Sequence, residues 1–143
     1  MTARWTRRLA AACAVACAVA LVPACGSDGG SAACVAPTPG GDPAAVPAGL
    51  DLRPYAVVTR AERQGEFVTA AGVSDLDVTE LADRLQDDAE GAGFTVLRRD
   101  DEGIEAELYL SRVSTQAGSV QIKIDPRCPG RTLVDLAVSG LVG

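Results

Sequence analysis

The side chains of this chain best suited to chemistry are carboxylates and cysteines, because its 143 residues include no histidine. The absence of histidine excludes Ser-His and Cys-His nucleophiles and histidine-ligated metal sites. One acidic run consists of Asp100, Asp101 and Glu102. If the fold brings it together with acids of the preceding segment, Asp87, Asp88 or Glu90, the carboxylates could bind a calcium ion or act as an acid/base pair. The run lacks the alternating Asp spacing of a calcium loop, and Gly103 follows it directly. We therefore interpret residues 100–103 as a turn between two strands.

The first 24 residues have the composition of an export signal. Residues 1–8 carry three arginines and no acid, and residues 9–22 are apolar without interruption. A basic start, a short apolar core and small residues after it are the pattern of a secretory signal peptide. The core is shorter than the roughly 20 residues that a membrane-spanning helix needs. We therefore expect residues 1–24 to be a signal peptide that takes Cys13 and Cys17 with it.

The four residues that end this segment, Val22-Pro23-Ala24-Cys25, resemble the lipobox of bacterial lipoproteins. In that family an aliphatic residue and a small residue precede an invariant cysteine. The resemblance implies that Cys25 carries a thioether-linked diacylglycerol and becomes the mature N-terminus. It implies a protein exported to the outer face of the cytoplasmic membrane, where two acyl chains hold it stably. The alternative is a plain secretory signal that leaves Cys25 as an ordinary thiol.

Cys34 and Cys128 remain once the signal peptide and the lipidated residue are set aside. An even pair in an oxidising compartment is expected to form one disulfide. That bond closes a loop of about 94 residues and ties the N-terminal tether to the far end of the domain. A redox or metal site is the alternative, and the lack of both histidine and a C-x-x-C pair disfavours it.

The chain from Cys25 onward is acidic. The signal peptide holds three of the 13 basic residues and none of the 19 acidic ones, so ten basic residues remain and the net charge is −9. Nucleic acids and anionic lipids are bound by basic surfaces, so we expect neither as an electrostatic partner. The basic residues are arginines except for Lys123, which together with abundant alanine and glycine is typical of a high-GC bacterium such as an actinobacterium.

Residues 25–49 have the composition of a flexible tether, with glycine and serine followed by four prolines. Such a stretch buries too little apolar surface to offset the entropy of ordering it. One folded domain is therefore expected over residues 50–143.

Apolar residues recur at helical spacing over residues 78–92, and Asp77 and Glu80 fit a capping box at its start. Residues 55–59 and 66–71 are expected to form a hairpin around a polar turn at residues 60–65. The acidic face of the helix is interpreted as its solvated side, with a docking surface as the alternative.

Four further segments alternate apolar and polar residues, as strands with one buried face do: residues 94–99, 104–112, 119–125 and 132–139. The element order β-β-α-β-β-β-β predicts a two-layer α+β domain, with one helix on an antiparallel sheet. This arrangement resembles cystatin-like folds in general topology only, and a fold does not carry a function with it.

The solvent face of the predicted sheet holds the best candidate for a contact surface, Tyr109. If the loop before residue 119 centres on Thr115, Tyr109 lies opposite Gln121 and Glu107 lies opposite Lys123. Phe67 and Phe94 are expected in the core instead.

These features favour a membrane-anchored envelope lipoprotein whose domain is a non-catalytic binding or accessory module with an envelope protein as partner and no cofactor. The alternative is an exported carrier of a small ligand or of calcium. An enzyme would need two carboxylates that converge in an apolar pocket.

Overall fold

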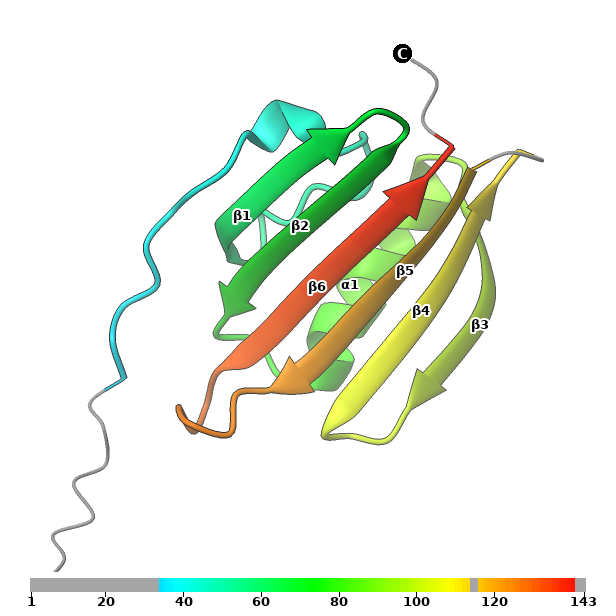
Figure 1. The fold of residues 1–143 in the computed structure, drawn as a ribbon. Coiled ribbons are helices and arrows are strands. Elements are labelled where there is room, and N and C mark those ends of the chain that lie inside the picture. The colour runs from blue at the N-terminus through cyan, green and yellow to red at the C-terminus, as the bar shows by residue number, and fades with distance from the viewer. Residues whose placement is uncertain (1–33, 114–115, 141–143) are drawn as a thin grey trace, which may run out of the picture. The chain divides into compact units, whose positions relative to one another are not determined.

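The structure, a computed structural model, describes residues 34–113 and 116–140. In chain order its elements are a 3-10 helix Pro43–Ala45, β1 Val57–Gln64, β2 Phe67–Ser74, α1 Val78–Gly91, β3 Thr95–Asp101, β4 Glu105–Arg112, β5 Gln116–Ile124 and β6 Thr132–Ser139. The strands form one antiparallel sheet in the order β1-β2-β6-β5-β4-β3 (Figure 1). This confirms the predicted α+β class and the predicted order of elements.

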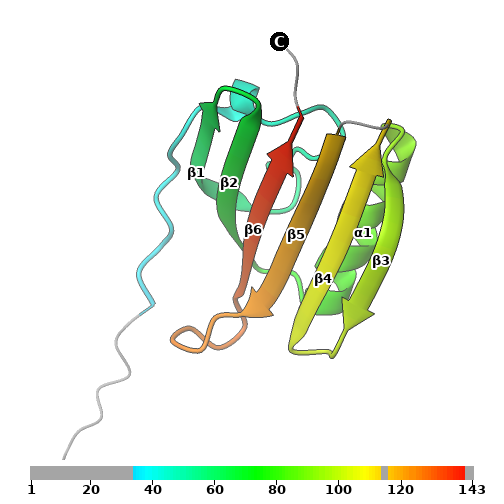
Figure 2. The same ribbon diagram turned by 45° about the vertical axis from the view of Figure 1, so that its right-hand side comes forward.

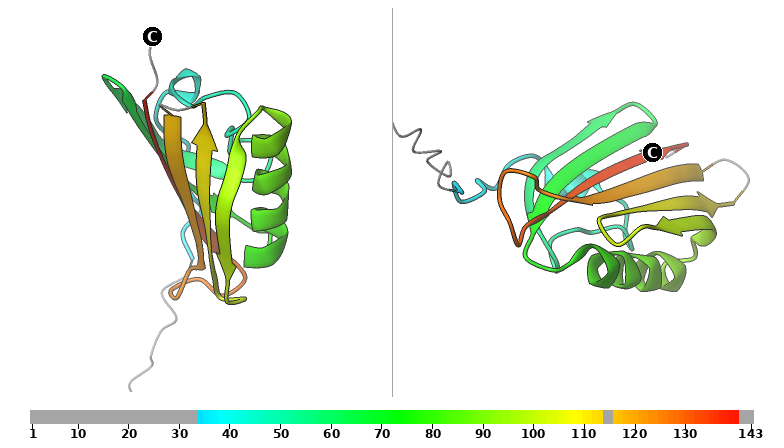
Figure 3. Two further views of the ribbon diagram at one scale, coloured as in Figure 1. Left: turned by 90° about the vertical axis from the view of Figure 1, so that its right-hand side faces the viewer. Right: turned by 90° about the horizontal axis from the view of Figure 1, so that it is seen from below.

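Helix α1 crosses one face of the sheet and carries the chain from β2 to the far edge strand β3 (Figure 3). The chain then returns through β4 and β5, and β6 closes the sheet by pairing with β2. No element of the described chain covers the opposite face, which we call the open face (Figure 2). Among the described residues, none of the helices is long and apolar enough to cross a membrane.

The apolar stripe of α1 explains its position on the sheet. Its buried side chains are Val78, Leu81, Ala82, Leu85 and Ala89. Asp77 accepts a hydrogen bond from the backbone N–H of Glu80 at 2.7 Å and so caps the first turn. The Glu80 carboxylate pairs with Arg84 at 2.7 Å, one turn further on. The helix ends at Gly91, and Gly93 follows in the left-handed region at φ +86°.

The core between helix and sheet is filled by alternate residues of the strands. These inward residues are Val68, Ala70, Ala106, Leu108, Leu110, Val120, Ile122, Val134, Leu136 and Val138. Phe94, just before β3, is 3% exposed, so its predicted place in the core is confirmed. The core position predicted for Phe67 is wrong, because its side chain is 61% exposed. Phe67 lies on the same side of β2 as Thr69, whereas Val68 and Ala70 point inward.

Two predicted turns are shorter in the structure than in the sequence interpretation. Strand β1 continues through Gln64, so the first hairpin turn has only Gly65 and Glu66, with Gly65 at φ +61°. Asp100 and Asp101 belong to β3 rather than to a turn. Both segments are polar apart from the buried Ala61, so their composition alone resembles that of a turn.

The predicted pairing of β4 with β5 is in error by two residues. Glu107 pairs with Gln121, Glu105 with Lys123, and Tyr109 with Ser119. The observed pairing is centred on position 114 instead of 115. A shift of the centre by one residue moves the partner of every residue in β4 by two positions along β5. Because two residues is one full period of a strand, the predicted face of every residue is unchanged.

Part of the stretch predicted to be a tether, residues 25–49, contacts the edge of the sheet. The N–H groups of Gly40 and Asp42 donate to the carbonyls of Val58 and Ala61, each at 3.0 Å. A Cβ on Gly40 would lie 2.6 Å from the Thr59 carbonyl oxygen, so this close approach to β1 requires glycine. Ala45, in the 3-10 helix that follows, is only 5% exposed.

Candidate functional site

A shallow groove lies on the open face between the aromatic side chains of Phe67 and Tyr109. Its volume is about 360 Å³, and none of the described residues that line it is charged. Register explains its floor: one row across the sheet runs from Thr69 to Ala137, Ser119 and then Tyr109. Three small residues in this row leave the backbone close to the surface, while Phe67 on β2 and Tyr109 on β4 border the depression. An exposed apolar surface bordered by aromatics is suited to contact with a partner.

Tyr109 is held in place by a polar network on the same face. Its hydroxyl donates to Glu107 Oε2 at 2.8 Å, and the Arg98 guanidinium lies 5.9 Å from the ring centre. The Gln121 amide donates to Glu105 at 2.8 Å and to Glu107 at 3.3 Å. The hydrogen bond to Glu107, with its negative charge, raises the pKa of Tyr109 above 10.0. The Tyr109 hydroxyl therefore stays protonated at physiological pH and can donate to Glu107.

The acidic run is not brought together with the helix acids named from the sequence. Asp101 binds Arg99 at 2.9 Å and accepts from the hydroxyl of Thr79, which lies in the first turn of α1. Asp88, near the other end of the helix, accepts from the Tyr55 hydroxyl at 2.8 Å. Within the described parts of the chain, no group of three or more Cys, Asp or Glu side chains is placed to hold a metal ion.

The carboxylates of β3 are instead neutralised by arginines. Asp100 pairs with Arg98 at 2.7 Å, and Arg99 joins Asp101 to Asp83 of α1 at 2.6 Å. The hydrogen bond from Arg99 lowers the pKa of Asp101 below 3.8. A general acid needs a raised pKa, so this shift has the wrong direction for acid catalysis.

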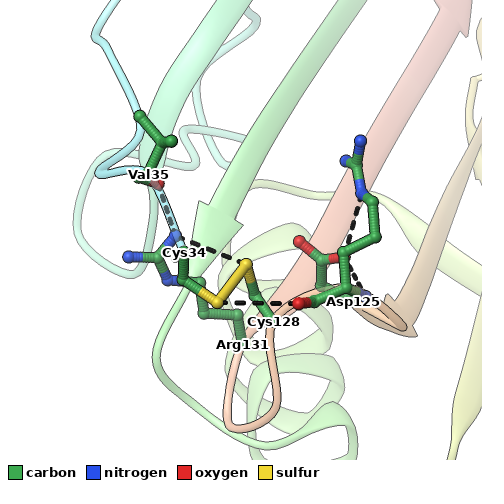
Figure 4. The surroundings of a disulfide bond; sticks show 6 residues. Cys34, Val35, Asp125, Cys128 and Arg131 are labelled. Atoms are coloured by element: carbon green, nitrogen blue, oxygen red, sulfur yellow. Dashed lines mark hydrogen bonds and ion pairs between the residues drawn. A yellow bond between two sulfur atoms is a disulfide. The ribbon is translucent and has the colours of Figure 1, made fainter. Parts of the chain in front are cut away.

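The second chemical feature is the predicted pair of cysteines. Cys34 and Cys128 form a disulfide with their Cα atoms 5.5 Å apart (Figure 4). Cys128 lies in the loop between β5 and β6, at the end of the sheet opposite the groove. Arg131 of the same loop donates to the Val35 carbonyl at 2.7 Å (Figure 4). Cys25 and the lipobox lie outside the described residues.

The sequence interpretation found Tyr109 and both cysteines but missed Phe67 and Arg131. The alternation of faces along β2 was the signal for Phe67. Since Val68 and Ala70 point into the core, Phe67 and Thr69 must point to the opposite face. Nothing in the sequence pattern marks Arg131, since its partner Val35 lies 96 residues away.

No family model matches the chain, and no curated protein resembles it significantly.

Proposed function

We propose that this chain is a membrane-anchored lipoprotein of the cell envelope, and that its α+β domain is a non-catalytic module that binds an envelope protein through the open face. The lipobox at Val22–Cys25 supports the anchor. The neutralised carboxylates of β3 and the absence of histidine support a role other than catalysis. We propose in addition that the domain is cystatin-like in the general topology of its sheet and helix.

The observation that carries this proposal is the position of the groove relative to the disulfide. The groove lies where β2 begins and β6 ends, whereas the disulfide lies where β5 ends and β6 begins. These points are separated by the length of β6, about 23 Å at 3.3 Å per residue. A tether held by Cys34 thus leaves the groove at the end of the sheet away from the anchor, accessible to another protein.

Site-specific photo-crosslinking in cells tests the proposed surface. A photo-reactive residue at Phe67 or Tyr109 is expected to give a discrete protein adduct. The same residue at Asp87, on the exposed side of α1, is the control and is expected to give none. Equal adducts from all three positions, or adducts from Asp87 alone, contradict the proposal.

The uncharged lining of the groove also favours a second candidate, an exported carrier of a small apolar ligand. A carrier retains its ligand, so mass spectrometry of the native protein is expected to show a bound small molecule that Tyr109→Ala loses. If the domain is instead a calcium carrier, calorimetric titration with calcium is expected to show heat of binding, and calcium is expected to raise the melting temperature. No heat and no shift in melting temperature exclude it.

A further inference from the structure

We propose that the Cys34–Cys128 disulfide is an exchangeable latch for the strap, residues 35–39, and that Arg131 promotes its opening by a thiol. The strap joins the disulfide to Gly40, where the chain meets the edge of β1.

Among the described residues, the hydrogen bonds and the disulfide that hold the strap lie at its two ends. At one end are the disulfide and the hydrogen bond from Arg131 to the Val35 carbonyl. At the other end, Gly40 donates to the Val58 carbonyl. Val35 is 83% exposed, and only Pro37 in the strap is partly buried. The strap therefore has little packing of its own to keep it in place once the disulfide opens.

A mostly apolar cavity of about 310 Å³ lies between the strap and the sheet. The strap side is formed by Cys34, Val35 and Pro37. The sheet side includes Val73 of β2 and Leu133 of β6. Release of the strap uncovers these two side chains at the disulfide end of the open face.

The two sulfur atoms are unequal in access and in charge environment. Cys34 is exposed, whereas Cys128 is 8% exposed, so an incoming thiolate reaches the Cys34 sulfur. The Cys128 Sγ lies 4.0 Å from Arg131 Nη1, and the Cys34 Sγ lies 3.7 Å from the Arg127 carbonyl oxygen. A cation beside Cys128 and a carbonyl dipole beside Cys34 both favour negative charge on Cys128. Cys128 is therefore the better leaving group.

The exchange reaction balances with an external dithiol as the reductant. Its first thiolate attacks Cys34 Sγ, the Cys34–Cys128 bond breaks, and Cys128 leaves with the electron pair as a thiolate beside Arg131. In the mixed disulfide, the second thiolate of the reductant attacks the reductant sulfur that is bonded to Cys34 and so releases Cys34. The reductant ends as a disulfide, and the two protons that it loses go to the two cysteines when these are protonated.

Opening the latch also lengthens the tether, a consequence that rests on the proposed anchor at Cys25. With the disulfide closed, the tether spans nine Cα–Cα steps from Cys25 to Cys34, a reach of about 30 Å when extended. With it open, the tether runs to Gly40, and the reach becomes about 50 Å.

A trapping experiment with a small monothiol, cysteamine, tests the direction of exchange on the mature chain that carries Cys25→Ser. At limiting cysteamine and short reaction times, rapid alkylation of the freed protein thiol prevents both its return attack and further reduction, so the mixed disulfide is preserved and peptide mass spectrometry locates it. We expect the adduct on Cys34 with Cys128 as a free thiol. An adduct on Cys128, or a disulfide that reacts only under unfolding conditions, overturns the proposal. This result does not depend on lipidation, so it is separate from the test of the anchor.

The role of Arg131 is tested by the rate of the same reaction. We expect Arg131→Gln to slow the exchange about three- to tenfold, because the leaving thiolate loses its cation, and Arg131→Lys to restore most of the rate. Arg127→Gln is the matched control on the same loop and is expected to change the rate less than about twofold. Equal rates for the wild type and Arg131→Gln overturn the assigned role.

Amide hydrogen exchange tests the strap itself. On reduction, the amide of Gly40, whose hydrogen bond to the Val58 carbonyl lies at the end of the strap, is expected to exchange faster because the freed strap lets that bond open more often, while the amide of Asp42, bonded to the Ala61 carbonyl, is unchanged. The same exchange rates before and after reduction contradict a latch.

Discussion

Removing the disulfide by the double substitution Cys34→Ala and Cys128→Ala should lower the free energy of unfolding substantially. The bond closes a loop of 94 residues. Loop-closure entropy for that length amounts to about 4.7 kcal/mol at 25 °C. The strap beside Cys34 is exposed, so the double variant loses few native packing contacts. We therefore expect a loss of about 3–5 kcal/mol, which arises mainly in the unfolded chain.

Urea denaturation followed by far-UV circular dichroism measures this loss. The only tryptophan is Trp5, in the predicted signal peptide, so tryptophan fluorescence cannot report on the mature chain. The dependence of the free energy on urea should also become steeper in the double variant, because an uncrosslinked chain exposes more surface when it unfolds. Val35→Ala, next to the disulfide but 83% exposed, is the matched control and should change the free energy by less than about 0.5 kcal/mol. A loss below about 1 kcal/mol in the double variant would refute the loop-closure reasoning.

Three further measurements address the core and the two polar networks. Leu85→Ala should lower the free energy of unfolding measured in urea by about 2–5 kcal/mol, because Leu85 is 1% exposed on the buried side of α1, whereas Leu97→Ala, at a side chain 67% exposed, should cost less than about 0.5 kcal/mol. Because the pKa of Asp101 is lowered by its hydrogen bond from Arg99, the ionised carboxylate stabilises the fold at pH values above 3.8, and this contribution is lost as the pH falls through the folded-state pKa. Asp101→Asn should therefore lose less stability than the wild type when the pH is lowered. An unchanged dependence of stability on acid pH contradicts the ion pair. Ultraviolet titration of the Tyr55→Phe variant, in which Tyr109 is the remaining tyrosine, should place its pKa above 10.0 and show that pKa fall on Glu107→Gln; no fall would show that the hydrogen bond is absent in solution.

The helix and most of the strands follow from the sequence because their patterns are long and regular. Helix α1 shows five buried residues at helical spacing with Asp77 at its cap. Strands β4 and β6 bury every second residue, which fixes both the type of element and its inward face. Element type and face are local properties, so a single sequence is sufficient to predict them.

The parts that could not be predicted depend on contacts between distant segments. Gly40 belongs to a stretch with the composition of a linker, yet its lack of a side chain is what lets the chain lie against Thr59. Composition records that a glycine is present but not whether it serves flexibility or close approach. The ion pair of Arg99 with Asp83 depends in the same way on how α1 packs beside β3, which no local pattern reveals.

The candidate site was predictable only in its outline. Tyr109 was placed on the solvent face by parity, and the disulfide followed from the number of cysteines that remain for pairing. The groove itself depends on the order of strands in the sheet, because its floor combines Thr69 of β2 with Ala137 of β6 and Ser119 of β5. Sequence order does not reveal that β6 lies between β2 and β5.

The most direct test of the proposed lipoprotein is the intact mass of the protein extracted from its native membrane, with and without reduction and alkylation. We expect a chain that begins at Cys25 with acyl groups attached, and two further thiols that appear only after reduction. The Cys25→Ser variant is the control and should yield no acylated product. An unacylated wild-type chain in the soluble fraction would contradict the anchor and would indicate a freely secreted domain.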